Sequence, residues 1–198
     1  MLLRQTWWMT DRPPLEHFLG LWFGVRQFEG VDPAKAVAPV MRFNHPVSET
    51  FDNDVQVLVM EQQGVWQWGQ TAEGRFVERE NEPDVRWRVI GENADEFWLH
   101  HAAFEAVTDL PASRSAQLFD EATIARIKRE VAPLPCGTWT WPGTTQTMHY
   151  RDASVVMICE DAGDYWVVAS APQEADLDWL DELNLTWDES DTRLTSES

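Results

Sequence analysis

The chain has 198 residues, of which 43% are hydrophobic, so it is long enough for one domain with a sizeable core. Its 34 acidic and 15 basic residues give a net charge of -19, which disfavours direct binding to nucleic acid or to an anionic membrane. No apolar run approaches the roughly 20 residues that span a bilayer, and the N-terminus has no signal-peptide pattern. We therefore expect a cytoplasmic protein.

The first predicted element is an amphipathic helix over about residues 13 to 28, where apolar residues recur near i, i+3, i+4 and i+7. A loop that contains prolines follows to about residue 46. Residues 55 to 60 and 65 to 70 alternate around a short polar stretch, which predicts a β-hairpin. Trp66 and Trp68 then share one face of the second strand.

The turn of this hairpin comprises Glu61, Gln63 and Gly64, and we expect it to be structural. Gly64 supplies the positive φ that a tight turn needs. Glu61 has two open interpretations: its carboxylate either ties down the backbone of the turn or faces a partner.

The middle of the chain alternates between predicted strands and helices. Residues 75 to 80 and 85 to 90 have strand patterns, and a capping box at residues 93 to 96 opens a central helix. A polar loop is expected over residues 108 to 118. A short amphipathic helix starts at Asp120 and places Ile124, Ile127 and Val131 on one face.

Strand patterns return at residues 138 to 141, 154 to 160 and 164 to 170, before a final helix over residues 173 to 184. The element order predicts an α+β fold, with a mainly antiparallel twisted sheet flanked by helices. We expect a single domain over residues 1 to 188 and a polar, acidic, disordered tail over 189 to 198.

The sequence contains no complete catalytic or metal-binding pattern, which favours a protein that is not an enzyme. His101 and Glu105 have the i, i+4 spacing of a metal pair, with His100 adjacent, but two ligands are too few. Cys136 and Cys159 lack metal-type spacing, and no nucleotide-binding loop occurs. We therefore expect no catalytic residues, no cofactor and no metal, while an enzyme built on Glu61 or the histidines stays as a minor alternative.

The C-terminal section is the most acidic part of the chain, with nine acids from residue 173 onward against one base, Arg193. Acidic side chains with interleaved aromatic residues suit a basic protein surface. The alternative is a solvated face that keeps the chain soluble. The predicted partner-binding residues are Asp176, Asp178, Asp181, Glu182, Trp179 and Trp187.

Several short motifs occur in a familiar order: "PLEHF", "VLVMEQQGVWQWGQ", "ENEPDVRW", "FWLHHAAFEAV" and "DYWVVASAPQEADLDWLDEL". Over about residues 15 to 188 this order resembles the SUKH superfamily, which includes fungal Smi/Knr-type cell-wall regulators and many bacterial immunity proteins. One departure is that Glu82-Pro83-Asp84 stands where family members carry Asp-Pro-Pro.

The resemblance implies a non-enzymatic α+β domain that binds other proteins. Family members with assigned roles neutralise toxin domains, often nucleases or deaminases, or act as interaction platforms. Together with the acidic charge, this predicts an immunity protein with a basic toxin as its partner. A regulatory or scaffold module without a toxin is the alternative.

Overall fold

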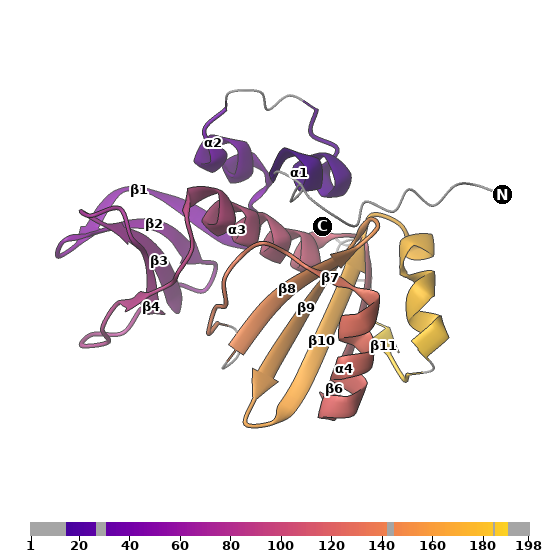
Figure 1. Ribbon diagram of the computed structural model, residues 1–198. Helices are drawn as coiled ribbons and strands as arrows, with labels where there is room; N and C mark the ends of the chain where they lie inside the picture. The colour runs from indigo at the N-terminus through magenta and orange to yellow at the C-terminus, as the bar shows by residue number, and fades with distance from the viewer. Residues whose placement is uncertain (1–14, 27–30, 142–144, 184, 190–198) are drawn as a thin grey trace, which may run out of the picture.

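The computed structural model describes residues 15–26, 31–141, 145–183 and 185–189 (Figure 1). The α-helices are α1 (Leu15–Phe23), α2 (Pro33–Val37), α3 (Ala94–Asp109) and α4 (Glu121–Glu130), and the 3₁₀ helices are η1 (Ala38–Val40) and η2 (Glu174–Leu183). Sheet 1 contains, in spatial order, β1 (Asn44–Asp52), β2 (Val55–Glu61), β3 (Trp66–Thr71), β4 (Phe76–Glu80) and β5 (Arg88–Val89). Sheet 2 contains β11 (Asp188–Glu189), β6 (Ala112–Phe119), β10 (Asp164–Ala171), β9 (Ser154–Asp161), β8 (Thr145–Arg151) and β7 (Ala132–Pro133).

The paired strands of both sheets run antiparallel, and helices pack on them, so the predicted α+β class is confirmed. The strands form two sheets, whereas the sequence suggested one. Figure 1 shows sheet 1 at one end of α3 and sheet 2 beneath it. The predicted tail begins at β11, and its remaining residues, 190–198, lie outside the described residues.

Sheet 2 lies between two helical layers and is buried on both faces. Val155, Met157 and Cys159 of β9 point to the cluster that contains α1, α2 and α3, while Val156 and Ile158 point to α4 and η2. This two-sided burial explains why the sequence of β9 is almost continuously apolar rather than alternating. Sheet 1 joins the α3 cluster through Val59, Trp68 and Phe76, among others.

The hairpin of β2 and β3 forms as predicted. Gly64 has a φ of 73°, and its N–H donates to the carbonyl oxygen of Glu61 at 2.8 Å. A Cβ atom at this position would meet only the Met60 sulfur, at 3.9 Å, so the need for glycine comes from the backbone and not from crowding.

Gly64→Val is therefore expected to lower the free energy of unfolding by more than about 1 kcal/mol, since a β-branched residue is strained at positive φ. Urea unfolding followed by circular dichroism measures this change. Gly91→Val is the matched control, because Gly91 has no positive φ and a Cβ there would meet nothing within 4 Å. Equal losses in the two variants would show that the turn does not require glycine.

Three predictions in the middle of the chain differ from the structure. The expected loop over residues 108 to 118 contains the end of α3 and most of β6, which pairs along the length of β10. Conversely, residues 138 to 141 form no strand but a single bridge between Trp139 and Gln146. The expected strand over 85 to 90 shrinks to the two residues of β5.

The terminal helices also differ from the prediction. The first helix, predicted over residues 13 to 28, covers Leu15–Phe23 within the described part of the chain and therefore ends earlier than expected. Residues 13–14 and 27–28 of the predicted range lie outside the described residues. The last is a 3₁₀ helix, η2, instead of an α-helix. Leu177, Leu180 and Leu183 are spaced by three residues, so a helix with three residues per turn aligns them on one buried face.

Candidate functional site

The first candidate site is the surface of η2, which contains five carboxylates and no basic residue. Its leucines pack on sheet 2, and its acidic side chains point outward. Of the predicted partner-binding residues on this helix, Asp178, Asp181 and Glu182 are exposed and Asp176 is half-buried. Arg114 of β6 bonds two acids of η2, with Nη1 2.6 Å from Asp181 Oδ1 and Nη2 2.8 Å from a Glu174 oxygen.

The two tryptophans that the sequence placed in this surface have other surroundings. Trp179 is only 8% exposed, and its indole N–H donates to Ser154 Oγ at 3.2 Å. The Arg151 guanidinium stacks over its ring at 4.9 Å. Trp187 is half-buried against the same apolar cluster. Both residues therefore support the fold, and charge dominates the outward surface of η2.

Glu61 is 2% exposed and serves the hairpin turn. Its Oε2 accepts N–H bonds from Gln63 at 2.8 Å and from Val65 at 3.4 Å. The side chain of Gln63 is exposed, so this residue enters the turn through its backbone. Of the two interpretations, the geometry favours a carboxylate that ties down the turn.

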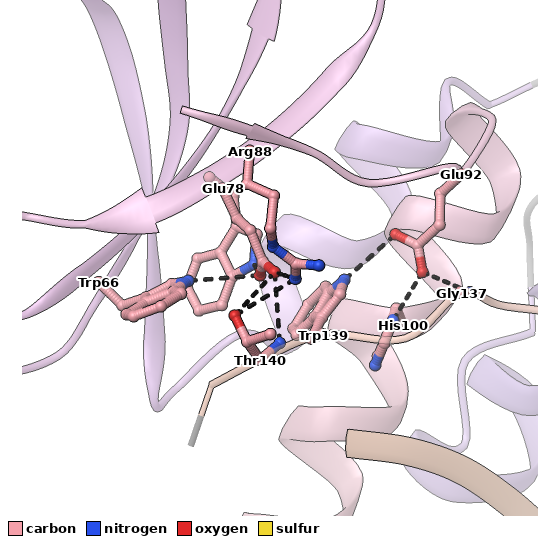
Figure 2. Close-up of polar contacts among 9 residues, drawn as sticks. Trp66, Glu78, Arg88, Glu92, His100, Gly137, Trp139 and Thr140 are labelled. Carbon is pink, nitrogen blue, oxygen red and sulfur yellow. Dashed lines mark hydrogen bonds and ion pairs between the residues drawn. The ribbon is translucent and has the colours of Figure 1, made fainter. Parts of the chain in front are cut away.

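The second candidate site is a polar junction between the sheets, which we define as Glu78, Arg88, Glu92, His100 and the segment 137–140 (Figure 2). The side chains of Glu78, Glu92 and His100 are fully buried, whereas that of Arg88 is 48% exposed. Glu78 reaches this segment from sheet 1: one carboxylate oxygen accepts from the backbone N–H and the hydroxyl of Thr140, at 3.3 and 3.2 Å. The same oxygen pairs with the Arg88 guanidinium. The other oxygen accepts from the indole N–H groups of Trp66 and Trp68, at 3.4 and 3.1 Å.

Glu92 holds the same segment from the side of α3. Its Oε1 accepts from the N–H of Gly137 at 2.6 Å and lies 2.7 Å from His100 Nδ1. Its Oε2 accepts from the indole N–H of Trp139 at 3.2 Å. The His100 ring stacks on the Trp139 ring with centroids 3.7 Å apart, so these three side chains orient one another.

His101 and Glu105 do not form the metal pair that their spacing allows. His101 is fully buried among rings that include Trp68, Phe97 and Trp139, and burial lowers the pKa of its imidazole well below the usual range. Glu105 instead accepts three backbone N–H bonds, from Arg42, Phe43 and Asn44, at 2.5 to 2.8 Å. Burial still raises the pKa of this carboxyl.

Cys136 adds a thiol to the junction. One ligand atom each from Glu92, His100 and Cys136 lie within 4.8 Å of one another. Burial raises the pKa of the Cys136 thiol well above its usual range, and the nearby charges of Glu92 and Glu96 raise it further. A raised thiol pKa lowers the fraction of thiolate, which is the nucleophilic form of cysteine.

His149 of β8 links stability to pH. Burial, and then the charge of Lys128, lower the pKa of its imidazole from 6.5 to about 4. The unfolded chain therefore binds a proton below pH 6.5 that the folded chain accepts only near pH 4. The stability that His149 contributes is present above pH 6.5 and is lost as the pH falls toward 4.

We expect that between pH 7 and 4 the wild-type protein loses up to about 3 kcal/mol more stability than His149→Gln does. Urea unfolding at a series of pH values measures the difference. Both proteins keep His101, so its contribution to the pH dependence of stability cancels in the comparison. His45→Gln is the control, because His45 is exposed on β1 and water solvates it in both states. Parallel pH curves for wild type and His149→Gln would contradict this assignment.

Glu78 and Glu92 of the junction, and Cys136 beside it, are the residues that the sequence did not indicate as a group. They come from β4, the loop before α3 and the segment after β7, so no local spacing connects them. The one sequence signal for a packed centre is the aromatic content of the flanking segments. In the part of the chain that the structure describes, no tryptophan is fully exposed, and five are buried: Trp22, Trp68, Trp98, Trp139 and Trp179.

Comparison of the chain with protein-family models, with curated proteins and with solved structures found no match. Among the described helices, none combines the length and the apolar character that crossing a membrane requires.

Proposed function

We propose that this protein is a non-enzymatic protein-binding domain that neutralises a basic toxin, of nuclease or deaminase type, through its acidic surface. The observation that carries the proposal is the division of η2 into a leucine face packed on sheet 2 and an outward face of carboxylates. The resemblance of the sequence to the SUKH superfamily supports the same assignment.

The charge of this surface suits a basic partner. Arg114 offsets one negative charge of the five on η2, and Asp188 of β11, the strand beside β6, adds another exposed acid. Such a field speeds encounter with a cationic groove, although single exposed ion pairs contribute little affinity. Apolar contacts are therefore needed as well, since a few buried anchors carry most of the affinity of an interface.

The test is capture of a partner by the tagged full chain in its source cell, at low and at high salt. We expect a basic protein that is released at high salt and that the double variant Asp176→Asn/Asp178→Asn captures several-fold less well. The matched control is Glu73→Gln/Glu80→Gln, which removes the same charge from exposed positions on the side of sheet 1. An acidic partner, no partner, or equal loss in both double variants would contradict the proposal.

The captured protein also separates the immunity role from a regulatory role. Expression of the partner alone should arrest growth, and coexpression of this chain should restore it. A basic partner that does not affect growth would instead indicate a regulatory or scaffold module.

A further inference from the structure

We propose that Glu92, His100 and Cys136 bind one divalent transition-metal ion, with Zn²⁺ as the ion that their chemistry favours. This site is separate from the acidic surface of η2, and the inference does not depend on the proposed function. The metal would join the start of α3 to the segment between β7 and β8, which also bonds to Glu78 of sheet 1.

The three donors converge although they are distant in sequence. Their ligand atoms lie within 4.8 Å of one another, the side chains of Glu92 and His100 are fully buried, and Cys136 is partly buried. An ion there would have three protein ligands and one side nearer to solvent. Three protein ligands plus a water molecule are a common arrangement for zinc.

The groups behind the donors hold them in place. The N–H of Gly137 and the indole N–H of Trp139 each bond one oxygen of Glu92, and the ring of Trp139 stacks on His100. Hydrogen bonds of this kind orient the ligands of metal sites and are needed for full affinity. Glu92 and His100 are therefore fixed by the fold, and Cys136 supplies its thiol from the residue next to Gly137.

The donor types select the metal. A thiolate, an imidazole and a carboxylate suit Zn²⁺, whereas Mg²⁺ and Ca²⁺ prefer oxygen ligands alone. One thiolate and one carboxylate cancel the two positive charges of the ion, so the loaded site is neutral inside the protein. The proton of the Cys136 thiol passes to solvent when the metal binds.

The geometry requires two adjustments. The three ligand atoms span up to 4.8 Å, whereas tetrahedral zinc holds a sulfur ligand roughly 3.6 Å from its nitrogen and oxygen ligands, so the Cys136 thiol moves toward the other two donors. The second adjustment concerns the other pair. Glu92 Oε1 and His100 Nδ1 are 2.7 Å apart, at hydrogen-bond distance. Tetrahedral zinc holds its nitrogen and oxygen ligands roughly 3.3 Å apart, so this pair opens by roughly 0.6 Å. The His100 imidazole then keeps its proton on Nε2, and two metal bonds replace the hydrogen bond.

The test is titration of the chelator-treated full chain with Zn²⁺ and, separately, with Co²⁺, whose spectrum reports its ligands. We expect one Zn²⁺ per chain, a rise in melting temperature, and a thiolate-to-cobalt charge-transfer band. Cys136→Ser should remove the band and weaken Zn²⁺ binding at least tenfold. Glu92→Gln should also weaken binding about tenfold or more, because it removes a charge from the site and a ligand.

The matched control is Cys159→Ser, since Cys159 is buried in β9 and burial raises its pKa to about 12. It should bind Zn²⁺ and Co²⁺ like the wild type. Circular dichroism of each metal-free variant separates lost ligation from lost folding. Absence of stoichiometric binding, or binding that persists unchanged in folded Cys136→Ser, would overturn the proposal.

Discussion

Replacing Glu78 with leucine is expected to lower the free energy of unfolding by about 3–5 kcal/mol, because it breaks a buried charged network and leaves its donors without an acceptor. The side chain of Glu78 is fully buried and accepts from two indoles, from Thr140 and from Arg88. Urea unfolding followed by tryptophan fluorescence and circular dichroism measures the loss. Glu78→Gln keeps one acceptor oxygen, so an intermediate loss of about 2 kcal/mol is expected.

Glu80→Ala is the control for Glu78. Glu80 lies on the same strand but is exposed, so its removal should change stability by no more than about 0.5 kcal/mol. A loss below about 1 kcal/mol in Glu78→Leu would mean that the network contributes little net stability, as is known for some buried ion pairs.

Replacing Glu105 with alanine should have the second-largest effect, a loss of about 3 kcal/mol or more. Three backbone N–H groups, of Arg42, Phe43 and Asn44, would lose their acceptor, and each unsatisfied buried donor costs about 1–3 kcal/mol. The raised pKa of Glu105 shows that its burial carries a cost, which reduces the net loss below the sum of the three bonds.

The same unfolding experiment tests this prediction, with Asp109→Ala as the control. Asp109 is the last residue of α3 and is exposed, so its replacement should change stability by less than about 0.5 kcal/mol. If both variants lose the same small amount, water replaces the carboxylate at the three N–H groups.

Local patterns in the sequence predicted those elements whose own side chains determine their structure. α4 has Asp120 as its cap and buries Ile124 and Ile127, and α3 has the expected capping box of Asn93 and Glu96. The hairpin around Gly64 followed from alternation and one glycine. In each case the signal spans only a few residues, so no tertiary information is needed.

β6 and β1 were missed because neighbouring strands, and not their own apolar content, stabilise them. β6 is mostly polar or small and buries Ala112 and Ala116 while it pairs with β10. β1 is an edge strand with a proline and mostly exposed side chains. Strand preference depends on such surroundings more than helix preference does.

The polar junction could not be predicted for a related reason. From the sequence alone, a glutamate on a strand, such as Glu78, is expected to be exposed to solvent. Only the packing of the segment 137–140 against it in the folded protein makes it buried. The apparent strand at residues 138 to 141 was misleading for the same reason: Trp139 and Thr140 bond to glutamate side chains and not to a strand partner beyond the single bridge. The acidic surface of η2, in contrast, was visible because composition alone defines it.

The junction also has a consequence for the order of folding events. The hydrogen bonds from its two glutamates to the segment 137–140 join residues that are 45 to 62 positions apart in the chain, as from Glu92 to Gly137 and from Glu78 to Thr140. Such distant contacts close late, since a long loop must be ordered first. Sheet 1 precedes α3 in the chain but obtains its final buried contacts only after the segment beyond β7 has arrived. During synthesis the N-terminal half would therefore complete its packing only after the C-terminal half has been made. We expect the two sheets to unfold in one thermal transition.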